Sequence, residues 1–310
     1  MPARRIAAID IGTNTVLLLV AEKDDRGELR AVREEATITR LGQGVDVARK
    51  LAPTAIERTN ACLSHYARIA RELGAERVGV VGTSAMRDAG GGDEVRAKVR
   101  ELFGVEARTI SGEEEAQLTF AGALSGLRHG EGPVAVFDIG GGSTEIVVGA
   151  SGAIRASHSF DVGSVRLTER HVRSDPPALA EIEAMARAAR DAFAAEPRVI
   201  EAARGLAEPP VGIAGTVTTI AAVALALEPY DGARVHGHTM TIGEVREVVK
   251  RLAAMPLEER RTVRGLEPKR ADVIVAGGVV VLAALEALGA SAMRISDRGV
   301  RWGLAETLAS

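Results

Sequence analysis

The chain has 310 residues, of which 46% are hydrophobic and 26% charged, a composition typical of a globular protein rather than a disordered one. This length suffices for two domains that each bury a core, and with 3% aromatic residues those cores must be aliphatic. The formal net charge of −3 argues against nucleic-acid binding, and the single Cys62 excludes an intrachain disulfide and favours a reducing compartment.

The first expected element is a strand, a polar turn and a second strand over residues 5–20. Aliphatic and β-branched residues stand on both sides of the turn at residues 10–15, which reads Asp-Ile-Gly-Thr-Asn-Thr. A helix over 54–73 follows, because apolar residues recur there at helical spacing after Pro53. The other elements expected in this half are a strand at 29–38, a loop at 41–44, a strand at 77–81, a helix at 93–103, a strand at 105–110 and a helix beginning at Ser111.

The strand–turn–strand pattern returns at Val134, with a second turn at residues 138–145 that reads Asp-Ile-Gly-Gly-Gly-Ser-Thr-Glu. Glu145 takes the position that Leu17 has in the first copy. Because both halves continue as strands alternating with helices, they indicate two related α/β domains, and a cleft between domains is a common ligand site. The later expected elements are strands at 154–160, 211–214, 238–242 and 292–295, a loop containing Gly163, helices at 178–195, 217–227, 243–254 and 272–288, a turn at 296–299 and a final helix.

Each turn combines a carboxylate, glycine and hydroxyl residues, which is typical of a site for a metal-bound phosphate chain. Successive backbone N–H groups form an anion nest, and a carboxylate beside it can hold Mg²⁺ directly or through water. The alternatives are that each aspartate only forms its turn and that Glu145 faces solvent. We expect metal ligation by Asp10, Asp138 and Glu145, and phosphate binding by Gly12, Thr13, Asn14, Thr15, Gly140, Gly141, Gly142, Ser143 and Thr144.

Further candidates follow other strands. Gly215 and Thr216 open an apolar helix whose N-terminus can face an anion, although a plain connection fits equally well. Thr83 and Ser84 end a buried strand and join the expected phosphate-binding residues. Arg87 follows them and would clamp a terminal phosphoryl group, the alternative being a solvated arginine.

Three glutamates open the helix after Ser111. A capping box of Ser111 and Glu114 explains one of them without any function, and another can serve as a general base. Seven basic residues form either a solvated helix face or a track for a polyanion: Lys250, Arg251, Arg260, Arg261, Arg264, Lys269 and Arg270.

Several common sites are disfavoured by the sequence. It has no Walker, dinucleotide-binding or hydrolase-serine motif, and His236-Gly237-His238 lacks the spacing of a zinc site. The apolar stretch 273–288 contains Gly277 and Glu286 and is shorter than the ~20 residues of a membrane span, so we expect a buried helix. Residues 1–10 show no secretion signal, and a cytoplasmic location is expected.

Taken together, these motifs resemble the exopolyphosphatase / guanosine pentaphosphate phosphatase family, in order and along the whole chain. The resemblance rests on the two turns and on four further segments: Gly-Thr-Ser-Ala-Met-Arg at 82–87, Ser-Gly-Glu-Glu-Glu-Ala at 111–116, Ala-Gly-Thr at 214–216 and Ser-Asp-Arg-Gly at 296–299. It implies that Glu115 is the catalytic base, that Arg87 contacts phosphate and that Asp138 and Glu145 serve the metal site. Longer members carry extra helical domains that this chain lacks, and Gln117 replaces an arginine of some members.

The resemblance implies an α/β fold with two ribonuclease-H-like (actin-like ATPase) domains, whose mixed sheets are flanked by helices around an interdomain cleft. The expected domains are 1–125 and 126–296, with a helix at about 297–310 that packs back on the first. The expected activity is that of an exopolyphosphatase, a Mg²⁺-dependent phosphoanhydride hydrolase acting on inorganic polyphosphate. A guanosine pentaphosphate phosphohydrolase, a small-molecule kinase and a sensor without turnover are the alternatives. No nucleic-acid or membrane partner is expected, and a homodimer is left open.

Overall fold

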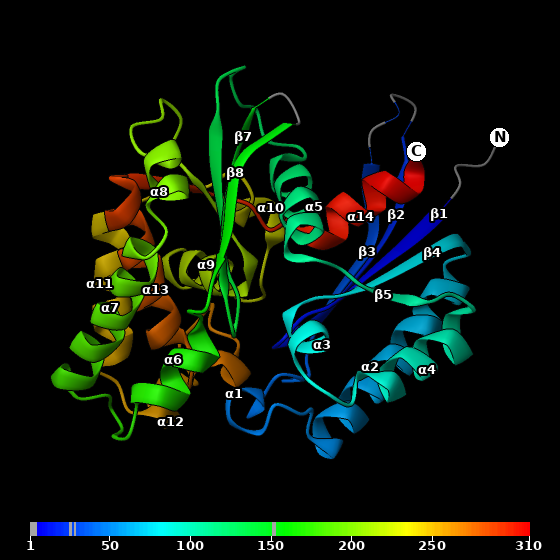
Figure 1. The fold of residues 1–310 in the computed structure, drawn as a ribbon, viewed down its shortest axis with the longest axis horizontal. Helices are drawn as coiled ribbons and strands as arrows, with labels where there is room; N and C mark the ends of the chain where they lie inside the picture. The colour runs from blue at the N-terminus through cyan, green and yellow to red at the C-terminus, as the bar shows by residue number, and fades with distance from the viewer. Residues whose placement is uncertain (1–4, 25–26, 28, 151–152) are drawn as a thin grey trace. The chain divides into compact units, whose positions relative to one another are not determined.

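The computed structural model describes residues 5–24, 27, 29–150 and 153–310, which divide into two compact units (Figure 1). Unit 1 comprises residues 1–122 together with 300–310, and unit 2 comprises residues 123–299. The elements that build unit 1 are β1 (Arg5–Ile11), β2 (Thr15–Lys23), β3 (Leu29–Ile38), α1 (Val45–Ala48), α2 (Pro53–Glu72), β4 (Ala75–Gly82), α3 (Ser84–Asp88), α4 (Gly92–Phe103), β5 (Ala107–Thr109), most of α5 (Gly112–Leu124) and α14 (Val300–Ala309).

Unit 1 is a five-stranded mixed sheet of order β3-β2-β1-β4-β5 with helices on both faces. Alternate residues of β1 point to opposite faces, as the strand geometry requires. Ala7 and Ile9 join the core under α2 and α4, whereas Ile6 and Ala8 pack with Trp302 of α14. Burying a large side chain such as Trp302 stabilises the fold by about 1.5–3 kcal/mol. Asp10 shares the strand face of Ile6 and Ala8, and therefore lies on the side of α14.

Unit 2 is a six-stranded mixed sheet of order β10-β11-β9-β6-β7-β8. Its elements are β6 (Val134–Ile139), β7 (Thr144–Ala150), β8 (Ala153–Phe160), α6 (Ser164–His171), α7 (Leu179–Ala194), α8 (Pro197–Ala203), β9 (Val211–Ile213), α9 (Ala214–Ala224), α10 (Gly232–Val235), β10 (Thr239–Thr241), α11 (Ile242–Ala253), α12 (Leu257–Arg260), the 3₁₀ turn η1 (Pro268–Arg270), α13 (Ile274–Leu288) and β11 (Ala292–Ile295).

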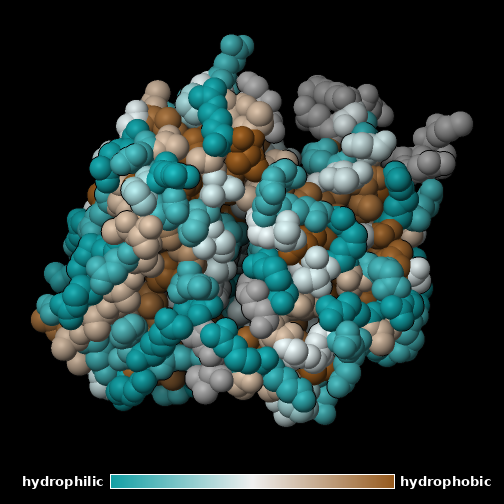
Figure 2. Space-filling view, viewed as in Figure 1, coloured by the Kyte–Doolittle hydropathy of each residue, from teal (hydrophilic) through white to brown (hydrophobic). Residues whose placement is uncertain are grey.

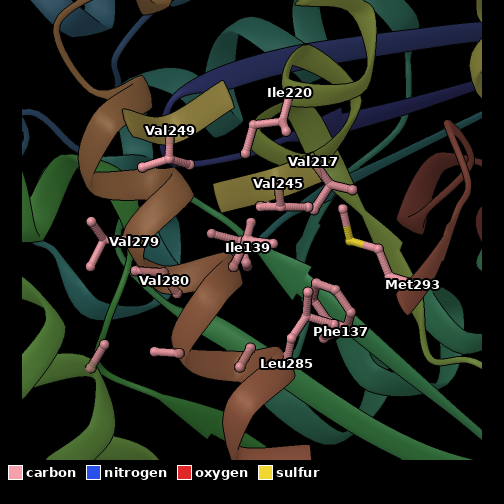
Figure 3. Close-up of a cluster of buried hydrophobic side chains, with 14 of the residues drawn as sticks. Phe137, Ile139, Val217, Ile220, Val245, Val249, Val279, Val280, Leu285 and Met293 are labelled. Carbon is pink, nitrogen blue, oxygen red and sulfur yellow. The ribbon is translucent and has the colours of Figure 1, made fainter. Parts of the chain in front are cut away.

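The core of unit 2 is aliphatic with few aromatic rings. Figure 3 shows Phe137 and Ile139 of β6 among valines and leucines of α9, α11 and α13. The apolar stretch expected to be a buried helix forms α13, and among the described helices none is long and apolar enough to cross a membrane. Hydrophilic residues dominate the face seen in Figure 2, and the strongly exposed large hydrophobic residues of the described chain are Leu179 and Tyr230.

The expected fold class is confirmed, with two mixed sheets flanked by helices. The strands expected at 29–38 and 292–295 occur with those bounds. The sequence missed the short helices α1, α3, α6, α8, α10 and α12, which are four to eight residues long and show too few turns for a clear periodicity. Helix α9 also begins three residues before the expected start, because Ala214 with φ 68° turns the chain directly from β9 into the helix.

Gly303 allows α14 to approach α5 closely, and its replacement by alanine tests this packing. An added methyl group would overlap the backbone carbonyl of Leu118, which cannot move aside as a side chain would. Gly303→Ala is therefore expected to lower the free energy of unfolding by about 1–3 kcal/mol in urea denaturation. Gly243→Ala is the control, since its methyl group would meet nothing closer than 3.8 Å, and it should not destabilise the protein. Equal effects of the two substitutions would contradict this packing.

Candidate active site

The carboxyl edge of the unit 1 sheet gathers most of the candidate residues of this unit. Strands β1, β4 and β5 run parallel, so their carboxyl ends meet at one edge. Asp10 lies near the end of β1 beside Val81, and Thr83 follows β4 and donates its N–H to the carbonyl of Ile11 at 3.2 Å. Ligands of open α/β sheets bind outside such edges.

The first turn is closed by its own backbone and held from behind. The N–H of Gly12 donates to the carbonyl of Thr15 at 3.1 Å, and a Cβ at Gly12 would lie 2.9 Å from that oxygen, so the turn requires glycine. The carbonyl of Thr13 accepts from Gly42, and the carbonyl of Asn14 accepts from Thr39 and Arg40, with N···O distances of 2.8–3.0 Å. Because C=O and N–H point in opposite directions across a trans peptide, these bonds direct the next N–H groups away from the segment 39–42.

The second turn repeats this construction in unit 2. The N–H of Gly140 donates to the carbonyl of Ser143 at 3.0 Å, as Gly12 does to Thr15. Here the segment behind the turn is the start of α6, where Ser164 and Val165 donate to the carbonyls of Gly140 and Gly141 at 3.0 and 2.9 Å. The internal duplication expected from the sequence therefore extends to individual hydrogen bonds, and each turn can present N–H groups to an anion.

Asp138 and Glu145 face each other across the β6–β7 pair. The register places them directly opposite, as it places Asp10 opposite Leu17 in unit 1, so the two carboxylates share one face of the sheet. Glu145 is 5% exposed and accepts a hydrogen bond from the hydroxyl of Ser159 at 2.7 Å. Like charges directly opposite on a sheet repel, and a cation or a shared proton relieves that repulsion.

Arg87 and Glu115 form an ion pair that the sequence could not show. The Arg87 Nη1 donates to Glu115 Oε2 at 3.0 Å and to the carbonyl of Ile110 at 3.2 Å, while Glu115 is 8% exposed. The backbone N–H of Glu114 donates to the hydroxyl of Ser111, and its carboxylate pairs with Arg108. Capping and pairing thus account for Glu114, and Glu115 is the glutamate held beside the arginine at the sheet edge.

Asp10 is the electrostatically unusual residue of unit 1. Burial raises the pKa of its carboxyl from 3.8 to about 7, and the nearby Arg301 opposes that rise. Its Oδ1 is buried without a hydrogen-bond partner among the described residues. Arg301 comes from α14 and is itself paired with Glu34 of β3. A buried carboxylate oxygen without a hydrogen-bond partner is suited to bind a cation.

The carboxylates of the two turns suit Mg²⁺ better than a metal that is ligated entirely by protein side chains. Among the described residues, no three His, Cys, Asp or Glu side chains group into a metal site. Mg²⁺ usually keeps several waters and binds through one or two carboxylates plus substrate phosphates. The unpartnered oxygen of Asp10 and the opposed pair of Asp138 and Glu145 meet that requirement within their own units.

Two expected phosphate-binding side chains have other tasks. Thr144 is fully buried and its hydroxyl donates to the carbonyl of Val162 at 2.6 Å, so this side chain supports the loop instead of facing a ligand. Thr216 is 4% exposed and packs against Gly277 of α13. Ser84 opens α3, but its side chain lies outside the described part of the structure.

The basic group expected as a solvated face or a polyanion track is not uniform. Arg260 is 2% exposed and donates to the backbone carbonyls of Leu252, Met255 and Ala271, so the prediction of a solvated face is wrong for this residue. Arg270 packs its guanidinium against Gly215 at the start of α9, and burial lowers its pKa. No local pattern in the sequence singles out Arg270, because more than fifty residues separate it from Gly215.

Comparison with known proteins identifies the class of protein that carries these turns. The sequence profile of the Ppx/GppA phosphatase family matches residues 19–309. The chain therefore belongs to the Ppx/GppA phosphatase family, and the family resemblance expected from the motifs is confirmed.

Particular relatives extend this result along the whole chain. It is 40% identical over 322 aligned residues to Exopolyphosphatase 2 of Mycobacterium tuberculosis, with all of both chains covered. Among solved structures, the Aquifex aeolicus member of the Ppx/GppA family is 33% identical with a TM-score of 0.82, covering 99% of this chain and 97% of the other. An exopolyphosphatase from Cytophaga hutchinsonii, 24% identical, shares the fold with a TM-score of 0.89 over 99% and 98% of the two chains.

The burial of Asp10 predicts a pH-dependent cost to stability. Between the ordinary carboxyl pKa of 3.8 and the raised value of about 7, the folded chain binds more protons at this site than the unfolded chain. The Asp10 contribution therefore makes the free energy of unfolding fall as pH rises through this range, by at most roughly 1.4 kcal/mol per pH unit.

Asp10→Asn should remove this slope. Urea unfolding in EDTA between pH 5 and pH 8 is expected to show the variant gaining stability relative to the wild type as the pH rises. Any constant offset reflects the buried amide, so the slope is the readout. A stability difference between the variant and the wild type that does not change with pH would show that the pKa of the Asp10 carboxyl is not raised.

Proposed function

We propose that this protein is an exopolyphosphatase that hydrolyses the terminal phosphoanhydride of inorganic polyphosphate and releases phosphate. The observation that carries the proposal is the pairing of Arg87 with the buried Glu115, 3.0 Å apart, at the carboxyl edge of the unit 1 sheet. The pair supports the proposal because it joins a carboxylate that could accept a proton to a cation that could bind phosphate, and Arg87 follows Thr83 closely in the sequence. The full-length similarity to Exopolyphosphatase 2 supports polyphosphate as the substrate.

In the proposed reaction, Glu115 orients a water molecule and accepts its proton as the water oxygen attacks the terminal phosphorus. The bond between that phosphorus and the bridging oxygen breaks, and the chain shortened by one phosphate leaves with the bridging oxygen. Arg87 stabilises the negative charge on the transferred group, and the N–H groups of a glycine turn can donate to phosphate oxygens. The carboxylates that would hold Mg²⁺ are Asp138 and Glu145 in unit 2 and Asp10 in unit 1, and the metal would neutralise phosphate oxygens.

Guanosine pentaphosphate is the second candidate substrate. A Guanosine-5'-triphosphate,3'-diphosphate pyrophosphatase of Aeromonas hydrophila is 29% identical over 96% of this chain, but the match spans only 58% of that longer protein. The match to Exopolyphosphatase 2 covers all of both chains, and this favours polyphosphate as the substrate. The family favours hydrolysis over the kinase alternative, in which phosphate would pass to an acceptor.

We also propose that the protein acts in a reducing compartment such as the cytoplasm. Cys62 is free and buried, and burial raises the pKa of its thiol, which leaves it unreactive. With a single cysteine, the fold does not depend on an intrachain disulfide and therefore does not require an oxidising environment.

Glu115→Gln tests the role of the base. The amide keeps the shape of the side chain but cannot accept the proton, so phosphate release should fall by about 10²–10⁴-fold while the protein folds and binds substrate. Phosphate release is measured with short and long polyphosphate, guanosine pentaphosphate and ATP at equal Mg²⁺.

Glu113→Gln is the matched control, because Glu113 is an exposed glutamate of the same helical turn, and it should retain wild-type rates. Wild-type rates in Glu115→Gln would overturn the assignment of the base. If wild-type protein released phosphate fastest from guanosine pentaphosphate, the second candidate would replace the first.

Asp138→Asn tests the metal site. Replacing one of the two opposed carboxylates removes a ligand charge, so half-maximal activity should require about tenfold or more Mg²⁺, on the scale of losing one charged interaction. Asp191→Asn is the control in the same unit, because Asp191 is an exposed aspartate of α7. An unchanged Mg²⁺ titration in Asp138→Asn would remove Asp138 from the metal site.

A further inference from the structure

The second glycine turn is held in place by α6, a helix absent from the sequence prediction. Its first residues supply the N–H groups of Ser164 and Val165 to the carbonyls of Gly140 and Gly141. Gly163 must be glycine for this contact, because a Cβ there would lie 2.6 Å from the carbonyl oxygen of Gly141. The start of α6 therefore packs directly against the carbonyl groups of the turn.

The third carbonyl of the turn is held by a side chain. Arg166 donates from Nε to the carbonyl oxygen of Gly142 at 2.6 Å, and its own N–H donates to the carbonyl of Gly141 at 3.1 Å. Its guanidinium also lies 3.4 Å from Asp161, a residue exposed to solvent, and a surface pair of this kind contributes little. The Gly142 contact joins the Arg166 side chain directly to the turn.

Holding the Gly142 carbonyl fixes the direction of the next N–H group. In the trans peptide between Gly142 and Ser143, the N–H of Ser143 points opposite to the carbonyl of Gly142. Among the backbone–backbone hydrogen bonds of the described residues outside helices and strands, none has the N–H of Gly141, Gly142 or Ser143 as its donor. Glycine permits backbone rotations that other residues resist, so this peptide plane needs an external restraint. The corresponding carbonyls of Thr13 and Asn14 in the first turn are restrained by backbone N–H groups.

We propose that Arg166 is a positioning residue that locks the Gly142–Ser143 peptide so that the N–H of Ser143 donates to a phosphate oxygen of the substrate. This inference rests on the proposed function, since it assigns the ligand of the second turn to a phosphoanhydride. Arg166 acts through the backbone of the turn, and its effect is therefore on the affinity of the protein for phosphate.

The test compares Arg166→Ala, Arg166→Gln and Arg166→Lys with two controls. Asp161→Asn removes an ionic partner of Arg166, and Arg170→Ala removes an exposed positive charge from the same helix. The measurements are KM and kcat for polyphosphate hydrolysis, the Kd for Mg²⁺–tripolyphosphate by calorimetry, and Tm.

Arg166→Ala and Arg166→Gln are expected to raise KM and Kd by about tenfold or more, as for the loss of a hydrogen bond to a charged group. Arg166→Lys should recover part of the binding, because its ammonium can donate to the Gly142 carbonyl. Guanidinium chloride should restore Arg166→Ala in part, whereas equal sodium chloride should not. Both controls should stay within about twofold of the wild type, because exposed charges contribute little.

Failure of the inference is distinguishable from failure of the proposed function. If Arg166→Ala lowers Tm but leaves KM and Kd unchanged, Arg166 has only a structural role and the inference is overturned. If the wild type binds tripolyphosphate but releases no phosphate from any substrate, the proposed function fails, and the Kd of the Arg166 variants still decides the inference. If the wild type does not bind tripolyphosphate, both are overturned.

Discussion

Parallel strand pairing is the constraint on which both halves of the site depend. Strand β1 pairs with β4 in unit 1, and β6 pairs with β9 in unit 2, each in parallel. The aspartates near the ends of β1 and β6 are thereby brought beside the segments that follow β4 and β9, although the sequence separates them widely. In unit 1 these segments carry Arg87 and in unit 2 they carry Gly215. Without this register the turns would keep their own hydrogen bonds, but the segments that follow β4 and β9 would not lie beside them.

The two units share the same turn but differ in the residue that lies opposite its aspartate in the neighbouring strand. In unit 1 the partner of Asp10 is Leu17, and Asp10 lies buried near Arg301. In unit 2 the partner of Asp138 is Glu145, which gives a pair of facing carboxylates. Unit 1 instead holds the ion pair of Arg87 and Glu115. The two units thus share the turn but differ in chemistry, with the candidate base in unit 1 and the two facing carboxylates in unit 2.

The sequence was sufficient to predict the strands and the turns, because runs of β-branched residues and aspartate–glycine patterns are local signals. The capping role of Ser111 toward Glu114 was equally local and is confirmed. Long-range contacts were not accessible in this way. Nothing near Arg270 in the sequence indicates its contact with Gly215, and nothing near Arg260 indicates three backbone acceptors. Helix α6 was missed because it has only eight residues, and Arg166 was missed with it.

Unit 1 is discontinuous in the chain, since residues 300–310 return to it after all of unit 2. Helix α14 brings Trp302 to the sheet face that carries Ile6 and Ala8, and it brings Arg301 into the electrostatic environment of Asp10. Protein synthesis proceeds from the amino terminus, and domains generally fold as they emerge. Until residues 300–310 are translated, the sheet face of Ile6 and Ala8 therefore lacks the cover of α14, and the arginine that moderates the buried Asp10 is synthesised only after the second unit.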